Sequence, residues 1–177
     1  MNQPPASGTL FGHPKGLFLL FSTEMWERFS YYGMRALLIL TLVAATESTN
    51  PGFGLSNGDA LLLYGYYTGL VYAATLFGGL IADNLLGQRK SIILGGTLMA
   101  IGQFTLFAAT PHSMSLFYVG LGFIIAGNGL FKPNISAIVG DLYPQGDARR
   151  DGGFTIFYMG INLGAFIAPL VLSLIHI

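Results

Sequence analysis

The chain has 177 residues, of which 53% are hydrophobic and 9% are charged, and its formal net charge is zero. This composition lies outside the usual range of soluble domains and is typical of an integral membrane protein. Without a basic excess nothing indicates a nucleic-acid partner, and without cysteine the chain can form neither disulfides nor thiolate metal sites.

Five apolar stretches are long enough to cross a bilayer, and they predict an all-α polytopic membrane helix bundle. The predicted helices cover residues 16–45, 59–83, 90–110, 114–140 and 152–176. The connectors between them are polar or rich in turn residues. Residues 1–15 are expected to form a tail, and they lack the apolar core of a removable signal peptide.

Basic residues outside the predicted helices lie in the tail and in the second and fourth connectors. They are Lys15, Arg89, Lys90, Arg149 and Arg150. By the positive-inside rule the tail is cytoplasmic, which predicts a multi-pass protein of the cell membrane surrounded by its lipid. We expect Arg149, Arg150 and Asp151 to form a solvated loop that serves orientation alone.

The first predicted helix carries a dense group of charged and phenolic side chains. It comprises Glu24, Glu27, Arg28, Tyr31, Tyr32 and Arg35. At helical pitch one face holds Glu24, Arg28, Tyr31 and Arg35, and the other two residues flank it. Because charge inside a membrane is costly, such a face is expected to line a transport or proton pathway.

Three further polar residues lie near the middle of their predicted helices: Tyr72 in the second, Lys132 in the fourth and Asn162 in the fifth. A pair between Lys132 and a carboxylate of the first helix is geometrically available. Polar groups of four helices are therefore expected to converge near the bilayer midplane, where transporters bind substrate.

Glycine is abundant, and two pairs have the spacing that lets membrane helices approach closely: Gly65/Gly69 and Gly160/Gly164. Both pairs are predicted to be packing seams. None of the three histidines has a second metal-type residue at ligand spacing, so no metal site is expected.

Three motifs in this order resemble the proton-dependent oligopeptide transporters, a branch of the major facilitator superfamily. The first is E-x-x-E-R-F-x-Y-Y-G, which residues 24–33 match in full. The second, residues 78–90, is similar to the superfamily signature between the second and third helices. The third is residues 157–164, preceded by Phe131-Lys132-Pro133-Asn134. The resemblance extends from about Gly12 to Pro169.

This resemblance implies a symporter that imports di- and tripeptides with protons by rocking two six-helix halves about a central cavity. The proton would be the coupling ion, and no other cofactor is implied. Five helices cannot complete a six-helix half. We therefore expect residues 16–177 to be an incomplete N-terminal half, from a truncated product whose partner is a missing C-terminal half.

The resemblance also implies roles for individual residues of this sequence. For proton coupling they are Glu24, Glu27, Arg28 and Lys132. For peptide binding they are Arg28, Arg35, Tyr31, Tyr32, Tyr72, Lys132 and Asn162, with Tyr64, Tyr66 and Tyr67 as neighbouring alternatives to Tyr72. For gating they are Asp83, Arg89 and Lys90.

Elementary chemistry supports these roles independently. A guanidinium offers a fork of N–H donors that matches a substrate carboxylate, and Arg35 is the first choice for that contact. Proton coupling needs a carboxylate whose proton affinity differs between two states. Our hypothesis is that Lys132 pairs with Glu24 or Glu27 in one conformation, and that protonation or peptide binding releases the pair.

Other functions remain open at this stage. A carrier for nitrate or another small anion would also use Arg28, Arg35 and Lys132. An intramembrane enzyme is disfavoured, because no nucleophile and base are paired and no catalytic residue is indicated. The charged group could be purely structural, Asn162 could instead bond between helices, and the chain could be a fragment without function.

Overall fold

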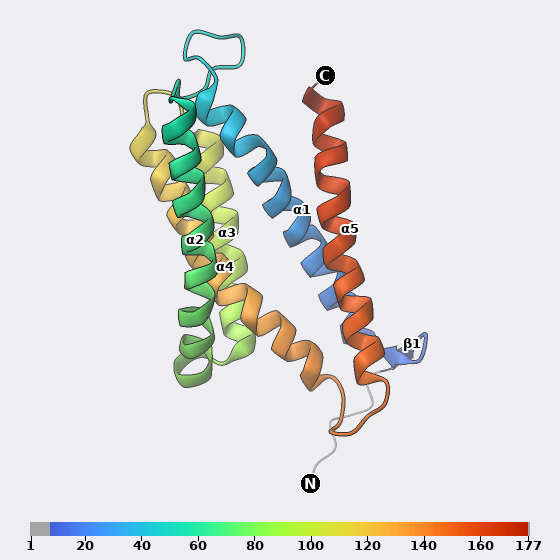
Figure 1. The fold of residues 1–177 in the computed structure, drawn as a ribbon. Helices are drawn as coiled ribbons and strands as arrows, with labels where there is room; N and C mark the ends of the chain where they lie inside the picture. The colour runs from blue at the N-terminus through green and yellow to red at the C-terminus, as the bar shows by residue number, and fades with distance from the viewer. Residues whose placement is uncertain (1–7, 177) are drawn as a thin grey trace. The chain divides into compact units, whose positions relative to one another are not determined.

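The structure is a computed structural model that describes residues 8–176 (Figure 1). Five long helices follow one another along the chain: α1 (Lys15–Val43), α2 (Asn57–Ile81), α3 (Gln88–Ala108), α4 (Met114–Asp141) and α5 (Arg150–His176). Each predicted helix boundary lies within two residues of the observed one. The prediction of an all-α membrane helix bundle is therefore confirmed.

Four segments of the described chain are long and apolar enough to cross a membrane: Asn57–Leu86, Gln88–Ala108, Met114–Asp141 and Arg150–Leu174. Helix α1, with 29 residues, is also long enough to cross a membrane, but the charged residues in its middle interrupt its apolar sequence. A helix of that length exceeds the roughly 20 residues that span a bilayer core. Its polar face therefore has to be turned away from lipid.

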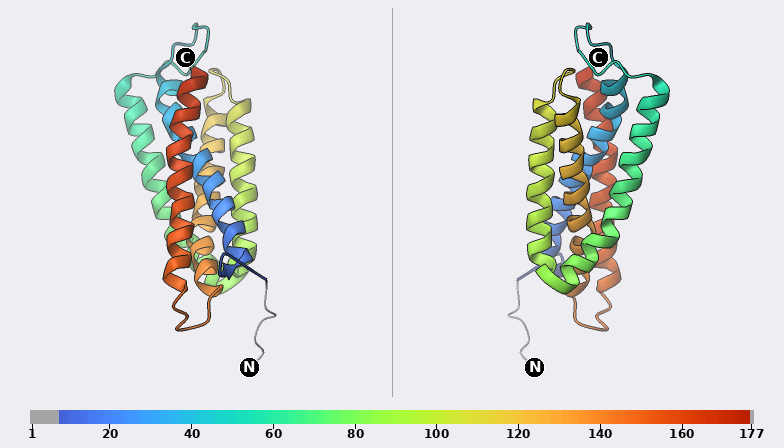
Figure 2. Two further views of the ribbon diagram at one scale, coloured as in Figure 1. Left: turned by 90° about the vertical axis from the view of Figure 1, so that its right-hand side faces the viewer. Right: turned by 90° about the vertical axis from the view of Figure 1, so that its left-hand side faces the viewer.

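The chain divides into two compact units. The first unit holds residues 1–35 and 136–177, and the second unit holds residues 36–135. Figure 2 gives two further views of the helices. The candidate site residues of α1 and α5 belong to the first unit, and those of α2, α3 and the first part of α4 belong to the second.

In the first unit, α1 and α5 run in the same direction and meet along a seam of small residues. Gly160 lies against Phe21, and Gly164 lies against the carbonyl of Met25 and the amide of Phe29. Further along, Gly33 of α1 lies against Leu172. The predicted seam at Gly160/Gly164 is confirmed, and it lets the two backbones come close enough to leave no room for side chains.

In the second unit, α2 and α3 pack against α4 through glycine contacts of the same kind. Gly78 of α2 lies against the backbone of Gly129, and a Cβ placed on Gly95 of α3 would lie 2.6 Å from the carbonyl oxygen of Gly127. Buried side chains of α2, Tyr67 and Val71, accompany Gly78. Helix α4 therefore forms the middle of this unit.

Within residues 8–176 the predicted seam at Gly65/Gly69 is not formed, because no atom of a neighbouring element lies within 4 Å of a Cβ placed at either position. The reason is helical phase. The buried residue Tyr67 lies two positions from each glycine and buried Val71 lies two positions from Gly69, and two positions correspond to about 200° around the helix. The two glycines therefore occupy the open face of α2.

These two glycine pairs give a matched test of close packing. We expect Gly164→Leu in the full-length protein to lower the free energy of unfolding by about 1–3 kcal/mol, because a side chain there meets the α1 backbone. Gly69→Leu, in open space, brings the same gain in helix propensity without the collision. Thermal unfolding in detergent measures both, and equal midpoints would contradict the packing account.

A short hairpin precedes α1 and was not predicted, since residues 1–15 were expected to be a tail. Strands β1 (Thr9–Leu10) and β2 (His13–Pro14) pair in antiparallel register. The turn residues have positive φ angles, 50° at Phe11 and 80° at Gly12. Residues 9–14 of the expected tail therefore form a hairpin, and residues 1–7 lie outside the described chain.

Candidate functional site

Arg28 is clamped by two carboxylates on α1. Its Nε lies 2.8 Å from Oε1 of Glu24 and 2.7 Å from Oε2 of Glu27. All three side chains are almost fully buried, with 4% of Arg28, 2% of Glu24 and 8% of Glu27 exposed. Glu24 and Arg28, which were predicted to share one face of this helix, are thus in contact one helical turn apart, and Glu27 reaches Arg28 from the flank of that face.

The geometry leaves part of the guanidinium available. The single hydrogen on Nε is donated to Glu24, so the contact with Glu27 is an ion pair rather than a second hydrogen bond from the same atom. The Nη2 amino group of Arg28 is buried and has no hydrogen-bond partner in the described chain. A buried donor without an acceptor is costly, which favours binding of an added acceptor.

Aromatic rings extend the cluster along the same face of α1. The ring of Tyr31 has the guanidinium of Arg28 at 5.6 Å and that of Arg35 at 5.5 Å from its centroid. Tyr32 meets Tyr31 edge to face at 5.4 Å, and Arg35 lies 6.0 Å from its ring. The predicted face that carries Glu24, Arg28, Tyr31 and Arg35 is therefore present as a continuous line of contacts.

Helix α5 packs against the segment of α1 that carries Arg28. Besides the α1 backbone, a Cβ on Gly164 would meet Cβ of Arg28 at 3.1 Å. The glycine spacing at Gly160/Gly164 was the sequence signal for this contact, but its position beside the charged residues could not be read from the spacing. Close packing here fixes the helical segment from which Arg28 projects.

Asn162 does not join the α1 cluster. Its side chain is exposed, two positions from both Gly160 and Gly164, and so it lies on the opposite side of α5 from the seam. Within residues 8–176 no hydrogen bond to another helix is formed by Asn162, so the alternative that it bonds between these helices is not supported. Its role in peptide binding stays a prediction.

In the second unit, Lys132 of α4 lies over the ring of Tyr72 of α2, with its Nζ 4.8 Å from the ring centroid. This is cation–π geometry. Tyr72 is 56% exposed, whereas Tyr67 is buried. Tyr72, the tyrosine of α2 that was preferred from the sequence, therefore contacts Lys132.

The predicted gating residues surround an irregular end of α2. Asp83 is exposed within a single π-helical segment, Ala82–Leu86, that continues α2 and ends at Gly87 with φ of 75°. Arg89 and Lys90 are exposed in the first turn of α3. None of the three forms an ion pair within the part of the chain that the structure describes.

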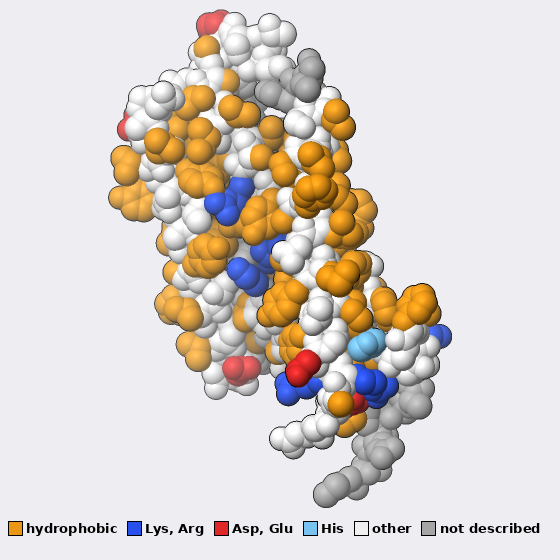
Figure 3. Space-filling view, turned by 45° about the vertical axis from the view of Figure 1, so that its right-hand side comes forward, with side chains coloured by type: hydrophobic (Ala, Val, Ile, Leu, Met, Phe, Trp, Pro, Cys, Tyr) orange, Lys and Arg blue, Asp and Glu red, His pale blue; other side chains and the backbone are white. Residues whose placement is uncertain are grey.

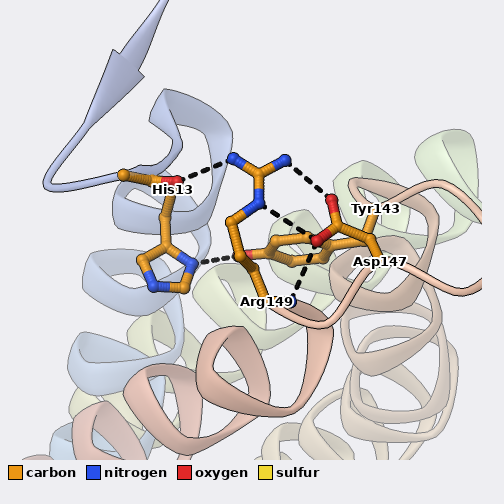
Figure 4. Close-up of polar contacts among 5 residues, drawn as sticks. His13, Tyr143, Asp147 and Arg149 are labelled. Atoms are coloured by element: carbon orange, nitrogen blue, oxygen red, sulfur yellow. Dashed lines mark hydrogen bonds and ion pairs between the residues drawn. The ribbon is translucent and has the colours of Figure 1, made fainter.

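A second polar cluster joins the hairpin to the connection between α4 and α5 (Figure 4). Nδ1 of His13 and the hydroxyl of Tyr143 are 2.8 Å apart. Arg149 donates from Nη1 to the carbonyl of Gly12 at 2.9 Å, and from Nη2 and Nε to Asp147 at 2.7 and 3.0 Å. We call these five residues the latch. Arg149 is half-exposed in this connection, as expected for a solvated loop, and it also bonds to Gly12 of the hairpin.

The contacts of the latch shift the pKa values of Asp147 and Tyr143. The hydrogen bonds from Arg149 lower the pKa of Asp147 from 3.8 to about 2. Burial raises the pKa of the Tyr143 hydroxyl. Because the Asp147 pKa is lowered on folding, its contribution to the latch is present above about pH 4 and is lost as the pH falls toward 2.

The latch predicts protection of the hairpin. Asp147→Ala removes the carboxylate that orients Arg149 toward Gly12, so amide hydrogen exchange in residues 9–14 should become faster. Asp151→Ala, on an exposed neighbour outside the latch, should leave it unchanged. Between about pH 5 and pH 8 the difference between the variants should persist once intrinsic exchange rates are corrected. Equal exchange in all three proteins would contradict the latch.

No group of three or more histidine, aspartate or glutamate side chains is arranged to hold a metal ion within residues 8–176. The cationic and phenolic groups of α1 instead fit an anion or a polar organic group. Arg28 has an available donor, and Tyr31 and Tyr32 offer aromatic faces beside it.

Comparison with known proteins agrees with the motifs. A model of the POT family matches residues 89–176. The chain is 51% identical to a di-/tripeptide transporter of Lactococcus lactis subsp. lactis over 93% of its own length and 33% of the relative's. It is 50% identical to the peptide transporter YePEPT of Yersinia enterocolitica over 94% of its length and 32% of that protein's.

Solved structures give the same result for the fold. A peptide transporter POT in complex with sulfate superposes with a TM-score of 0.87 and 49% identity, over 93% of this chain and 33% of that one. A POT family transporter in complex with 5-aminolevulinic acid superposes with a TM-score of 0.87 and 46% identity, over 94% and 33%. The present chain spans about a third of the length of these relatives. It belongs to the POT family, as its motifs predicted.

Proposed function

We propose that this chain is the first part of a carrier that moves di- and tripeptides across the cell membrane together with protons. The observation that carries the proposal is the buried cluster of Glu24, Glu27 and Arg28, in which two carboxylates that could bind a proton meet an arginine with an available donor. The names of its relatives, which are di-/tripeptide and peptide transporters, support the same substrate class.

The carboxylate end of a peptide is the group that the α1 face would bind. Arg35 is the first choice for a two-pronged contact, and Nη2 of Arg28 provides a further donor on the same face. The rings of Tyr31 and Tyr32 would border the site with apolar faces and hydroxyl groups. Such surfaces accept many side chains without demanding one.

The coupling proton would be held by Glu24 or Glu27. Both carboxylates are buried beside the guanidinium of Arg28, and the proton affinity of a carboxylate in such a place changes when its surroundings change between two states. Lys132, held over Tyr72, is proposed to take part as a further cation. The carrier would change between inward-open and outward-open states, with Asp83, Arg89 and Lys90 at the gate.

The chain would lie in the cell membrane with its N-terminus in the cytoplasm. A second half of the carrier would be needed to complete the transport pathway. Residues 1–15 would form a cytoplasmic segment and residues 16–177 part of the first half. No enzymatic activity and no cofactor other than the proton are proposed.

Uptake by the full-length protein in liposomes tests the proposal. We expect an inward proton gradient to drive dialanine above its external concentration, and we expect collapse of the gradient to end that accumulation. The cations Arg28, Arg35 and Lys132 also suit a small anion, so labelled nitrate is the second substrate. Accumulation of nitrate without dialanine would replace the peptide proposal with an anion carrier.

A further inference from the structure

An apolar groove opens in the first unit where the hairpin meets the beginnings of α1 and α5. It has a volume of about 470 Å³ and is lined by Phe11, His13, Phe18, Phe21, Ile156 and Met159. Figure 3 shows hydrophobic side chains gathered beside a histidine and basic side chains near the base of α5. None of these lining residues belongs to the charged face of α1.

The depth of the groove matches the edge of the hydrocarbon layer. Phe18 and Phe21 lie in the first two turns of α1, and Ile156 and Met159 lie in the second and third turns of α5. At 1.5 Å per residue these positions are about 5–14 Å from the helix ends. In a spanning helix that interval covers the boundary between lipid headgroups and acyl chains.

The hairpin holds an aromatic side chain outward at a conformational cost. Phe11 has φ of 50°, which is rare for a bulky residue, and 86% of it is exposed. Its ring meets Phe18 edge to face at 6.1 Å, and Arg149 holds the next residue, Gly12. Residues in such conformations cluster at functional sites, and Phe is one of the apolar residues that interfacial segments bury at the boundary between headgroups and acyl chains.

A basic residue, Lys15, lies one helical turn before the groove residue Phe18. Lys15 is exposed and lies three residues before Phe18, on the same side of α1. Its side chain passes close to Gly8, and it forms no ion pair among residues 8–176. Arg149, by contrast, already forms an ion pair with Asp147. Lys15 is therefore available to an anionic headgroup.

We propose that this groove is a phospholipid site, in which an acyl chain from the surrounding bilayer lies along Phe18, Phe21 and Met159 and the phosphate lies at Lys15. Apolar lining, interfacial depth and the cation at the rim each match one part of that ligand. The site is separate from the peptide face, so it does not depend on the proposed function.

Photolabelling in liposomes tests the site. The full-length protein is reconstituted in phosphatidylcholine and phosphatidylglycerol with a small amount of phosphatidylglycerol that carries a diazirine on one acyl chain. We expect label on the groove residues Phe18, Phe21, Ile156 and Met159. Met159→Trp, which fills the groove, should lower this labelling about tenfold, the equivalent of nearly two buried methylene groups. Leu19→Trp, on an exposed position of α1 outside the groove, should retain it.

Two further variants separate the parts of the site. Phe11→Gly suits the positive φ and removes one wall, so labelling should fall while the hairpin persists. Lys15→Gln should lower labelling about fivefold by removing one charge near the headgroups. Unchanged labelling in Met159→Trp and Phe11→Gly would overturn the proposal. Label that maps instead to a protein segment seated in the groove would overturn it as well.

Discussion

Replacing Glu24 with glutamine in the full-length protein is expected to abolish uphill peptide uptake while exchange of peptide across the membrane continues. The carboxylate of Glu24 accepts the hydrogen bond from Nε of Arg28 at 2.8 Å in a buried setting. Glutamine keeps an oxygen for that bond and cannot bind or release a proton. Binding would survive, and the link to the gradient would be lost.

Glu27→Gln is the companion experiment, because Glu27 lies 2.7 Å from the same nitrogen. The residue that carries the proton should lose accumulation, and the other should lose less. Glu47→Gln, at an exposed position between α1 and α2, is the matched control. Undiminished uphill uptake in both Glu24→Gln and Glu27→Gln would contradict proton coupling through this cluster.

Replacing Arg35 with glutamine is expected to weaken dipeptide binding about thirtyfold. A hydrogen bond to a charged group contributes about 2 kcal/mol, which corresponds to that change in affinity. The guanidinium lies over Tyr31 and Tyr32 at 5.5 and 6.0 Å, at the end of the polar face of α1. Isothermal titration with dialanine measures the effect.

A comparison of substrates shows whether the lost contact is to the carboxylate. The wild-type protein should prefer dialanine to dialanine amide, which has no negative charge, and Arg35→Gln should lose most of that preference. Arg150→Gln, at an exposed position outside the α1 face, serves as the control. If Arg35→Gln weakened the acid and the amide equally, a merely structural role of Arg35 would be indicated.

The sequence was sufficient for the helices and for the face of α1, because both depend on local periodicity. Spans of about 20 apolar residues predict membrane helices, and the spacing of Glu24, Arg28, Tyr31 and Arg35 places them on one side of any helix. The clamp of Glu27 on Arg28 was available from the same geometry, although the sequence could not show which rotamers would meet.

Features that depend on contacts distant in the chain were not predictable. Arg149 bonds to Gly12 across 137 positions, and His13 meets Tyr143 across 130. No local sequence pattern predicts either of these contacts. The hairpin was missed for a related reason, since its turn places Phe11 in a conformation that usually belongs to glycine or asparagine.

Small-residue spacing identified one seam and misplaced another. Gly160/Gly164 and Gly65/Gly69 have the same spacing, yet Gly164 lies against α1 and Gly69 faces open space. The spacing permits close approach and does not say which face of a helix has a neighbour. Asn162 shows the same limit, because its depth in α5 was inferred correctly while its side of the helix follows only from the packed glycines.

The most direct test of the central claim follows protons and peptide together. Full-length protein is reconstituted in liposomes that contain a pH-sensitive dye, with a negative interior potential and no initial pH gradient. Addition of dialanine outside should lower the internal pH in the wild-type protein, and the fall should be absent in the variant whose carboxylate carries the proton, Glu24→Gln or Glu27→Gln. Entry of dialanine into wild-type liposomes with no change of internal pH would contradict the account.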